Sequence, residues 1–183
     1  MHIDDPLGRA LLALARNAIG GRFDLVPAPV DALPELATPG ATFVTLTESG
    51  ELRGCIGSLR AERPLSEDVR ANAQAAAFAD PRFPPLARHE FGHVRIEVSL
   101  LGEAEFMNFT DEADALAQLR PHVDGVILFH GCRRATFLPQ VWESLPDPAR
   151  LLAQLKMKAG LSPALWDDRI MLARYEVRKW QET

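Results

Sequence analysis

The sequence TFVTLTESGELRGCIGSL, residues 42–59, decides the fold class of this 183-residue chain. Its first part, residues 42–47, is rich in β-branched and aromatic side chains, which favour a strand. Ser49 and Gly50 are typical of a two-residue turn, and residues 52–59 supply a return strand. We therefore expect an antiparallel hairpin here.

The rest of the chain extends this pattern. Further strands are expected at residues 94–100, where apolar and polar side chains alternate, in a second hairpin at 123–138 around Gly131, and at 170–177. Helices are expected from residue 6 to the end signal Gly20-Gly21, and at residues 67–79, 111–120 and 148–159. Asp4 or Asp5 would cap the first, Ser66 the second and Asp147 the last. Because the strands come mainly as hairpins, we predict an α+β fold over residues 1–183: a mainly antiparallel sheet with packed helices, in a larger subdomain plus a smaller one.

Composition excludes several function classes. The chain is 47% hydrophobic and 25% charged, with a net charge of -5 and a pI of about 5.5, so we expect no nucleic-acid partner. No apolar run approaches the ~20 residues of a membrane helix, and the acidic start does not resemble a signal peptide. With only Cys55 and Cys132 present, we expect a cytoplasmic protein with reduced cysteines.

The strand at residues 52–57, LRGCIG, carries the best candidate site. Side chains alternate along a strand, so Arg53 and Cys55 would share one face. In a regular hairpin, Cys55 would pair with Val44 and Arg53 with Leu46.

The placement of Arg53 and Cys55 on one strand face bears on the reactivity of the cysteine. Thiolate is the reactive form of cysteine, and a nearby cation favours it while apolar burial opposes it. Cys55 and Arg53 are therefore candidate catalytic residues, and Gly54 and Gly57 are candidate ligand contacts because glycine inside a strand allows close approach. The alternative is structural: Cys55 is a small buried hydrophobe, and the glycines let the alanine-rich helix pack tightly on the sheet.

Three further residues are candidate ligand contacts. Arg134 and Thr136 share a strand face and can hold a carboxylate or phosphate; the alternative for Arg134 is a solvent-facing or ion-paired side chain. Glu97 lies mid-strand on a polar face, where it is either a general base or a member of a cross-strand ion pair.

Two other patterns are weaker. Residues 89–93, HEFGH, match the H-E-x-x-H zinc pattern, but that pattern needs a helix, and Gly92 and the following strand argue against one. We therefore expect no metal site there. Arg82, in the rigid turn after the second helix, is expected to cap that helix, and the sequence indicates no particular cofactor.

Six segments occur in a fixed order along the chain: LRGCIG (52–57), PLSEDV (64–69), DPRFPPL (80–86), IEVS (96–99), VDG (123–125) and RRATFLPQVW (133–142). With these segments the chain resembles the AMMECR-type domain family, whose bacterial members are called AmmeMemoRadiSam system protein A. The resemblance implies a single α/β domain over residues 1–183 that has a larger and a smaller subdomain, with the hexapeptide in the larger one. It implies no particular reaction, and the family name associates the protein with Memo-type and radical SAM partner proteins.

Two hypotheses for function follow. In the first, the hexapeptide strand forms a small-molecule site that is enzymatic through Cys55. In the second, the protein is a non-enzymatic binding or accessory module that acts with the Memo-type and radical SAM proteins.

Overall fold

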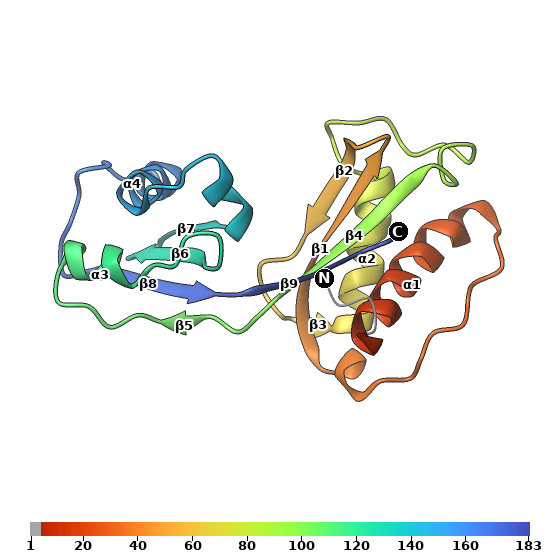
Figure 1. Ribbon diagram of the computed structural model, residues 1–183, viewed down its shortest axis with the longest axis horizontal. Coiled ribbons are helices and arrows are strands. Elements are labelled where there is room, and N and C mark those ends of the chain that lie inside the picture. Colours follow the sequence, from red (N-terminus) through yellow and green to blue (C-terminus); the bar gives the residue numbers. More distant parts are fainter. Residues whose placement is uncertain (1–4) are drawn as a thin grey trace. The chain divides into compact units, whose positions relative to one another are not determined.

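The computed structural model describes residues 5–183 as two compact units (Figure 1). Unit 1 comprises residues 5–101 and 178–183, and unit 2 comprises residues 102–177. Each unit has its own antiparallel sheet, its own helices and its own buried core. The predicted α+β fold with a larger and a smaller part is confirmed. Within residues 5–183, no helix has the length and apolar character needed to cross a membrane.

Unit 1 is built on the predicted hairpin. Its sheet has the order β2-β1-β4-β9, with β3 also paired to β1; the strands are β1 (Pro39–Glu48), β2 (Glu51–Gly57), β3 (Arg63–Pro64), β4 (Val94–Leu101) and β9 (Val177–Gln181). Ser49 and Gly50 both have positive φ, 52° and 85°, as a type I′ hairpin turn requires. The hairpin and its turn are therefore confirmed.

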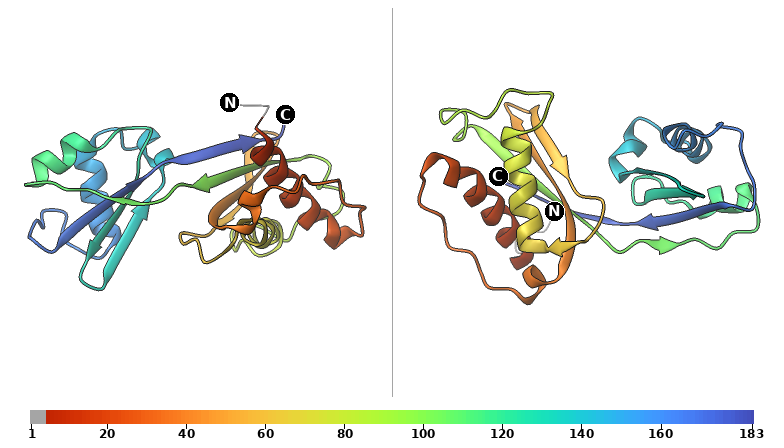
Figure 2. Two further views of the ribbon diagram at one scale, coloured as in Figure 1. Left: turned by 90° about the horizontal axis from the view of Figure 1, so that it is seen from below. Right: turned by 180° about the vertical axis from the view of Figure 1, so that it is seen from behind.

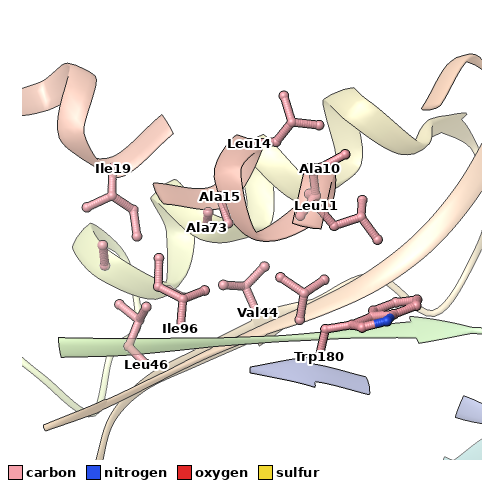
Figure 3. Packing of buried hydrophobic residues seen from close by; sticks show 14 of the residues in the cluster. Ala10, Leu11, Leu14, Ala15, Ile19, Val44, Leu46, Ala73, Ile96 and Trp180 are labelled. Atoms are coloured by element: carbon pink, nitrogen blue, oxygen red, sulfur yellow. The ribbon is translucent and has the colours of Figure 1, made fainter. Parts of the chain in front are cut away.

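The helices of unit 1 pack on one face of this sheet. Helix α1 (Pro6–Gly20) begins after Asp5, whose side chain accepts a hydrogen bond from the Leu7 amide; Asp4, the other predicted cap, lies outside the described residues. Helix α2 (Leu65–Phe78) begins two residues before the predicted start, so Ser66 lies inside its first turn and does not cap it. Figures 2 and 3 show both helices against the sheet, where Val44, Leu46 and Ile96 are fully buried.

Unit 2 contains the second predicted hairpin. Its sheet has the order β5-β8-β6-β7, formed by β5 (Glu105–Phe106), β6 (Gly125–His130), β7 (Arg133–Phe137) and β8 (Ile170–Tyr175). Helices α3 (Glu112–Gln118) and α4 (Pro148–Lys158) complete it, and Trp142 lies fully buried in its core. A short 3-10 helix occupies Pro139–Glu143 in unit 2, and two others occupy Gly21–Phe23 and Pro34–Ala37 in unit 1.

The predicted register of the first hairpin is wrong. Cys55 pairs with Thr45, not with Val44, and Leu46 pairs with Gly54, not with Arg53. The cause is a β-bulge between Leu46 and Thr47, which leaves Arg53 as an extra residue on β2. A bulge shifts all subsequent pairs by one residue and therefore changes which side chains meet across the sheet.

Candidate functional site

The corrected register aligns polar side chains across three strands of unit 1. Cys55 on β2 pairs with Thr45 on β1, and Thr45 pairs in turn with Glu97 on β4. A carboxylate oxygen of Glu97 lies 3.8 Å from Nζ of Lys179 on β9. We call Cys55, Thr45, Glu97 and Lys179 the polar row. It lies on the sheet face opposite the helices, because Val44 and Leu46, the alternate residues of β1, belong to the helix-covered core.

The members of the polar row are reachable from solvent. Cys55 and Thr45 are half-buried, and the side chains of Glu97 and Lys179 are 25% and 37% exposed. Neighbouring strands lie about 4.8 Å apart, so the backbones at Cys55 and Glu97 are separated by about 10 Å. A small molecule of that length that lies across the strands can contact both side chains.

Two polar side chains contact Cys55, one at its sulfur and one at its backbone carbonyl. The Thr45 hydroxyl lies 3.3 Å from the sulfur and can donate a hydrogen bond to it. The guanidinium of Arg82 is the second group. The pKa of Arg82 is raised, first by hydrogen bonding to Asp80 and then by attraction to Asp80 and to Cys55, while desolvation acts in the opposite direction. Thr45 therefore supplies a hydrogen-bond donor at the sulfur, and Arg82 a positive charge at the same residue.

Asp80 and Arg82 also bind the backbone of Cys55. The Cys55 amide donates to Asp80 Oδ2 at 2.8 Å, and Arg82 Nη2 donates to the Cys55 carbonyl at 3.2 Å. Because β2 is an edge strand, these side chains satisfy backbone groups that would otherwise lack a neighbouring strand. The predicted role of Arg82 as a helix cap is wrong: its hydrogen bonds go to Asp80 and Cys55.

Arg53, the cation that the sequence placed beside Cys55, binds elsewhere. Its Nε and Nη2 donate to the two carboxylate oxygens of Glu90 at 2.8 and 3.1 Å. These hydrogen bonds are the largest cause of the raised pKa of Arg53 and of the lowered pKa of Glu90. Arg53 therefore fixes the bulge to the loop that carries Glu90, and its role in catalysis stays a prediction.

The two glycines of the hexapeptide lie in tight packing. A Cβ on Gly54 would lie 2.2 Å from the Ala76 carbonyl oxygen of α2, and one on Gly57 would lie 2.3 Å from the ring of Phe43. Close packing therefore accounts for both residues, as the structural alternative expects. Their contact with a ligand remains a prediction.

Arg134 and Thr136 lie in unit 2, on β7. The Thr136 hydroxyl is buried and donates to the Val126 carbonyl at 3.0 Å, and its oxygen lies 3.1 Å from the Tyr175 hydroxyl. Arg134 places its guanidinium 5.3 Å from the centre of the Phe129 ring. Thr136 is thus engaged internally, whereas the charge of Arg134 lies over an aromatic side chain.

The segment around the H-E-x-x-H pattern does not form a helix. Residues 88–93 form turns, and the Glu90 carboxylate accepts hydrogen bonds from Arg53 and from the Ala87 amide. Among residues 5–183, no group of three or more metal-ligating side chains is close enough to hold an ion.

Sequence reasoning missed Thr45, Arg82 and Lys179 as neighbours of the candidate residues. Thr45 would have been found with the correct register, since it lies one residue from the predicted partner of Cys55. Arg82 belongs to the DPRFPPL segment already noted for its family resemblance. No sequence signal indicates Lys179.

The fold and the polar row together define an α+β protein of two units whose signature strand presents a cysteine on the sheet face opposite its helices. The AMMECR1 family model matches residues 12–180, and the chain belongs to this family. The resemblance inferred from the sequence is therefore confirmed.

Relatives and a solved structure agree with this assignment. The chain is 37% identical over 178 residues to a protein of Sulfolobus acidocaldarius, covering 92% of this chain and 78% of the relative. It is 37% identical over 199 residues to a protein of Aeropyrum pernix, covering 100% and 81%. The crystal structure of uncharacterized protein PH0010 from Pyrococcus horikoshii matches with a TM-score of 0.82 and 32% identity, covering 98% of this chain and 93% of that one.

Proposed function

We propose that the polar row is a reaction site in which Cys55 acts as a nucleophile towards a small carbon electrophile that carries a carboxylate or phosphate. The observation that supports this most is the Thr45 hydroxyl 3.3 Å from the Cys55 sulfur, together with the Arg82 guanidinium held 3.2 Å from the carbonyl oxygen of the same residue. In the reaction, the thiolate sulfur forms a bond to the electrophilic carbon. The electron pair of the bond that breaks leaves with the departing group.

Arg82 is suited to bind the anionic group of the substrate. Its Nη1 has no hydrogen-bond partner within residues 5–183, and its side chain is 53% exposed. A guanidinium binds carboxylate and phosphate well because its donors match their geometry.

Glu97 is suited to a different task across the row. It is separated from Cys55 by Thr45 and is paired with Lys179, so it can accept a proton from, or hydrogen-bond to, the far part of a bound molecule. Lys179 offers a second positive charge to the same molecule.

The role of Arg82 can be tested with two alkylating agents of different charge. Iodoacetate is anionic and iodoacetamide is neutral. The iodoacetate rate divided by the iodoacetamide rate at Cys55 therefore reports attraction by a nearby cation. We expect Arg82→Ala to lower this ratio several-fold, Arg82→Lys to retain part of it, and Thr45→Val to slow both reagents equally. Mass spectrometry of the cysteine peptides gives each rate.

The same chain supplies two controls. Cys132 is an exposed free thiol in unit 2, and Arg150→Ala removes an exposed arginine of unit 2. Neither the Cys132 rates nor the Arg150→Ala protein should show the change. An unaltered ratio at Cys55 in a folded Arg82→Ala protein, checked by circular dichroism, would refute the assignment of Arg82.

One observation favours the accessory role as a second candidate. Phe106 and Met171 of unit 2 are 62% and 50% exposed, and Phe106 packs on Phe129 with ring centres 5.6 Å apart. Exposed apolar side chains of this size often mark protein interfaces. We propose Memo-type and radical SAM proteins as the partners, and co-purification that Met171→Glu abolishes would support this candidate.

A further inference from the structure

A separate polar cavity lies beyond the end of the hexapeptide strand. It has a volume of about 480 Å³ and is lined by Gly57, Ser58, Leu59, Arg60, Glu62, Arg63 and Asp68. This volume lies within the range of small-molecule sites. The cavity contains none of the polar-row residues, so a ligand here does not depend on Cys55 chemistry.

A buried carboxylate organises one wall of the cavity. Asp68 is 1% exposed, and its Oδ2 accepts hydrogen bonds from the Thr42 amide, the Thr42 hydroxyl and Asn72, each between 2.8 and 2.9 Å. Its Oδ1 accepts from the Ser58 hydroxyl and from Arg63 Nη2, both at 2.7 Å. Five donors therefore satisfy this carboxylate, and Asp68 holds Arg63 in a fixed position.

The rest of the Arg63 guanidinium remains available. Among residues 5–183, neither Nε nor Nη1 of Arg63 has a hydrogen-bond partner, and the side chain is 44% exposed. A guanidinium fixed at one edge keeps further N–H donors that can bind an oxyanion.

Arg60 supplies a second cation at the same cavity. Among residues 5–183 its one ion pair is with Glu62, at 3.6 Å, and the side chains of Arg60 and Glu62 are 67% and 71% exposed. An exposed ion pair of this kind contributes little and exchanges readily. An anionic ligand can therefore replace the Glu62 carboxylate at Arg60.

We propose that this cavity binds the oxyanion group of a small molecule, a phosphate or a carboxylate, between Arg60 and Arg63. Asp68 and its hydrogen-bond donors position Arg63, Arg60 closes on the ligand, and Glu62 competes with it. The competition by Glu62 gives the proposal a distinctive consequence: removal of this acid should strengthen binding, whereas removal of Arg60 should weaken it.

The test is a titration of the full chain with inorganic phosphate, and separately with acetate, followed by amide chemical shifts in NMR spectra. We expect saturable shifts at residues 58–63 in the millimolar range, with the stronger response to one of the two anions identifying the preferred group. Arg60→Ala should weaken binding by about fivefold or more, and Glu62→Gln should strengthen it. Both changes fall on exposed side chains, so the fold should survive them.

Arg63→Lys keeps a charge beside Asp68 but loses the free guanidinium donors, and it should also weaken binding. The matched control is Arg150→Ala, an exposed arginine of unit 2, which should leave the titration unchanged. The absence of saturable shifts at residues 58–63 with both anions, or equal affinity of the wild-type, Arg60→Ala and Glu62→Gln proteins, would overturn the proposal.

Discussion

Gly54 shows how one residue of the signature strand is constrained by its neighbours. The space where its side chain would lie is occupied by the backbone of α2, with the Ala76 carbonyl oxygen 2.2 Å from a Cβ. Backbone in a helix cannot move aside as a flexible side chain can. The sequence indicated that glycine here allows a close approach, and the structure identifies α2 as the element that approaches.

Gly54→Ala should therefore destabilise unit 1. We expect the free energy of unfolding, measured in urea, to fall by about 1–3 kcal/mol, because overpacking a tight site typically destabilises a protein by this amount. Gly92→Ala is the matched control, because within residues 5–183 no atom beyond its chain neighbours lies within 4 Å of its Cβ position, and its φ is not positive. A Gly54→Ala protein as stable as the Gly92→Ala protein would show that α2 does not constrain the strand in this way.

At the scale of elements, the hairpin could be predicted but its bulge could not. The turn residues Ser49 and Gly50 are local signals, and both are used as predicted. The bulge places Arg53 where it binds Glu90, which lies 37 residues away along the chain. A contact of this separation leaves no local pattern, so the register, and with it the neighbour of Cys55, could not be read from the strand itself.

The edge of β2 should give the protein a measurable pH dependence. The hydrogen bond from Arg82, followed by those from the Cys55 and Arg82 amides, lowers the pKa of Asp80 well below its usual value of 3.8, against the opposing effect of burial. A lowered pKa in the folded state contributes stability that is present above 3.8 and is lost as the pH falls through the folded value. This stability should be absent from Asp80→Asn at every pH.

The difference in unfolding free energy between wild type and Asp80→Asn should therefore be largest at neutral pH and shrink at about pH 3. Urea unfolding at both values measures it. Asp31→Asn, which removes an exposed carboxylate, should show no such change. A difference that stays constant between the two pH values would contradict the role of Asp80.

At the scale of the whole molecule, the chain forms two units with separate cores. The sequence predicted one final strand at residues 170–177, whereas the structure has β8 in the sheet of unit 2 and β9 in the sheet of unit 1. The return of the chain to unit 1 depends on distant contacts: Trp180 fills the space above Gly8, and Glu182 pairs with Arg16. Contacts between residues so far apart in sequence leave no local pattern. The presence of a larger and a smaller part could therefore be predicted, but the boundary between β8 and β9 could not.

Unit 2 is continuous in sequence, so it should fold on its own. A fragment of residues 102–177 contains the complete second core and its sheet. We expect cooperative thermal unfolding by circular dichroism and dispersed amide NMR signals. A fragment that unfolds without a transition would show that the second core is insufficient by itself.

The most direct test of the reaction site compares the two free cysteines of the native protein. Cys55 is half-buried, whereas Cys132 is exposed, so access alone would make Cys55 the slower to react. The Thr45 hydroxyl and the Arg82 guanidinium should reverse this order. Iodoacetamide labelling at neutral pH, with mass spectrometry of both peptides, should show Cys55 modified faster than Cys132. Slower labelling of Cys55 in the folded protein, with equal rates only after denaturation, would contradict a nucleophilic role for this residue.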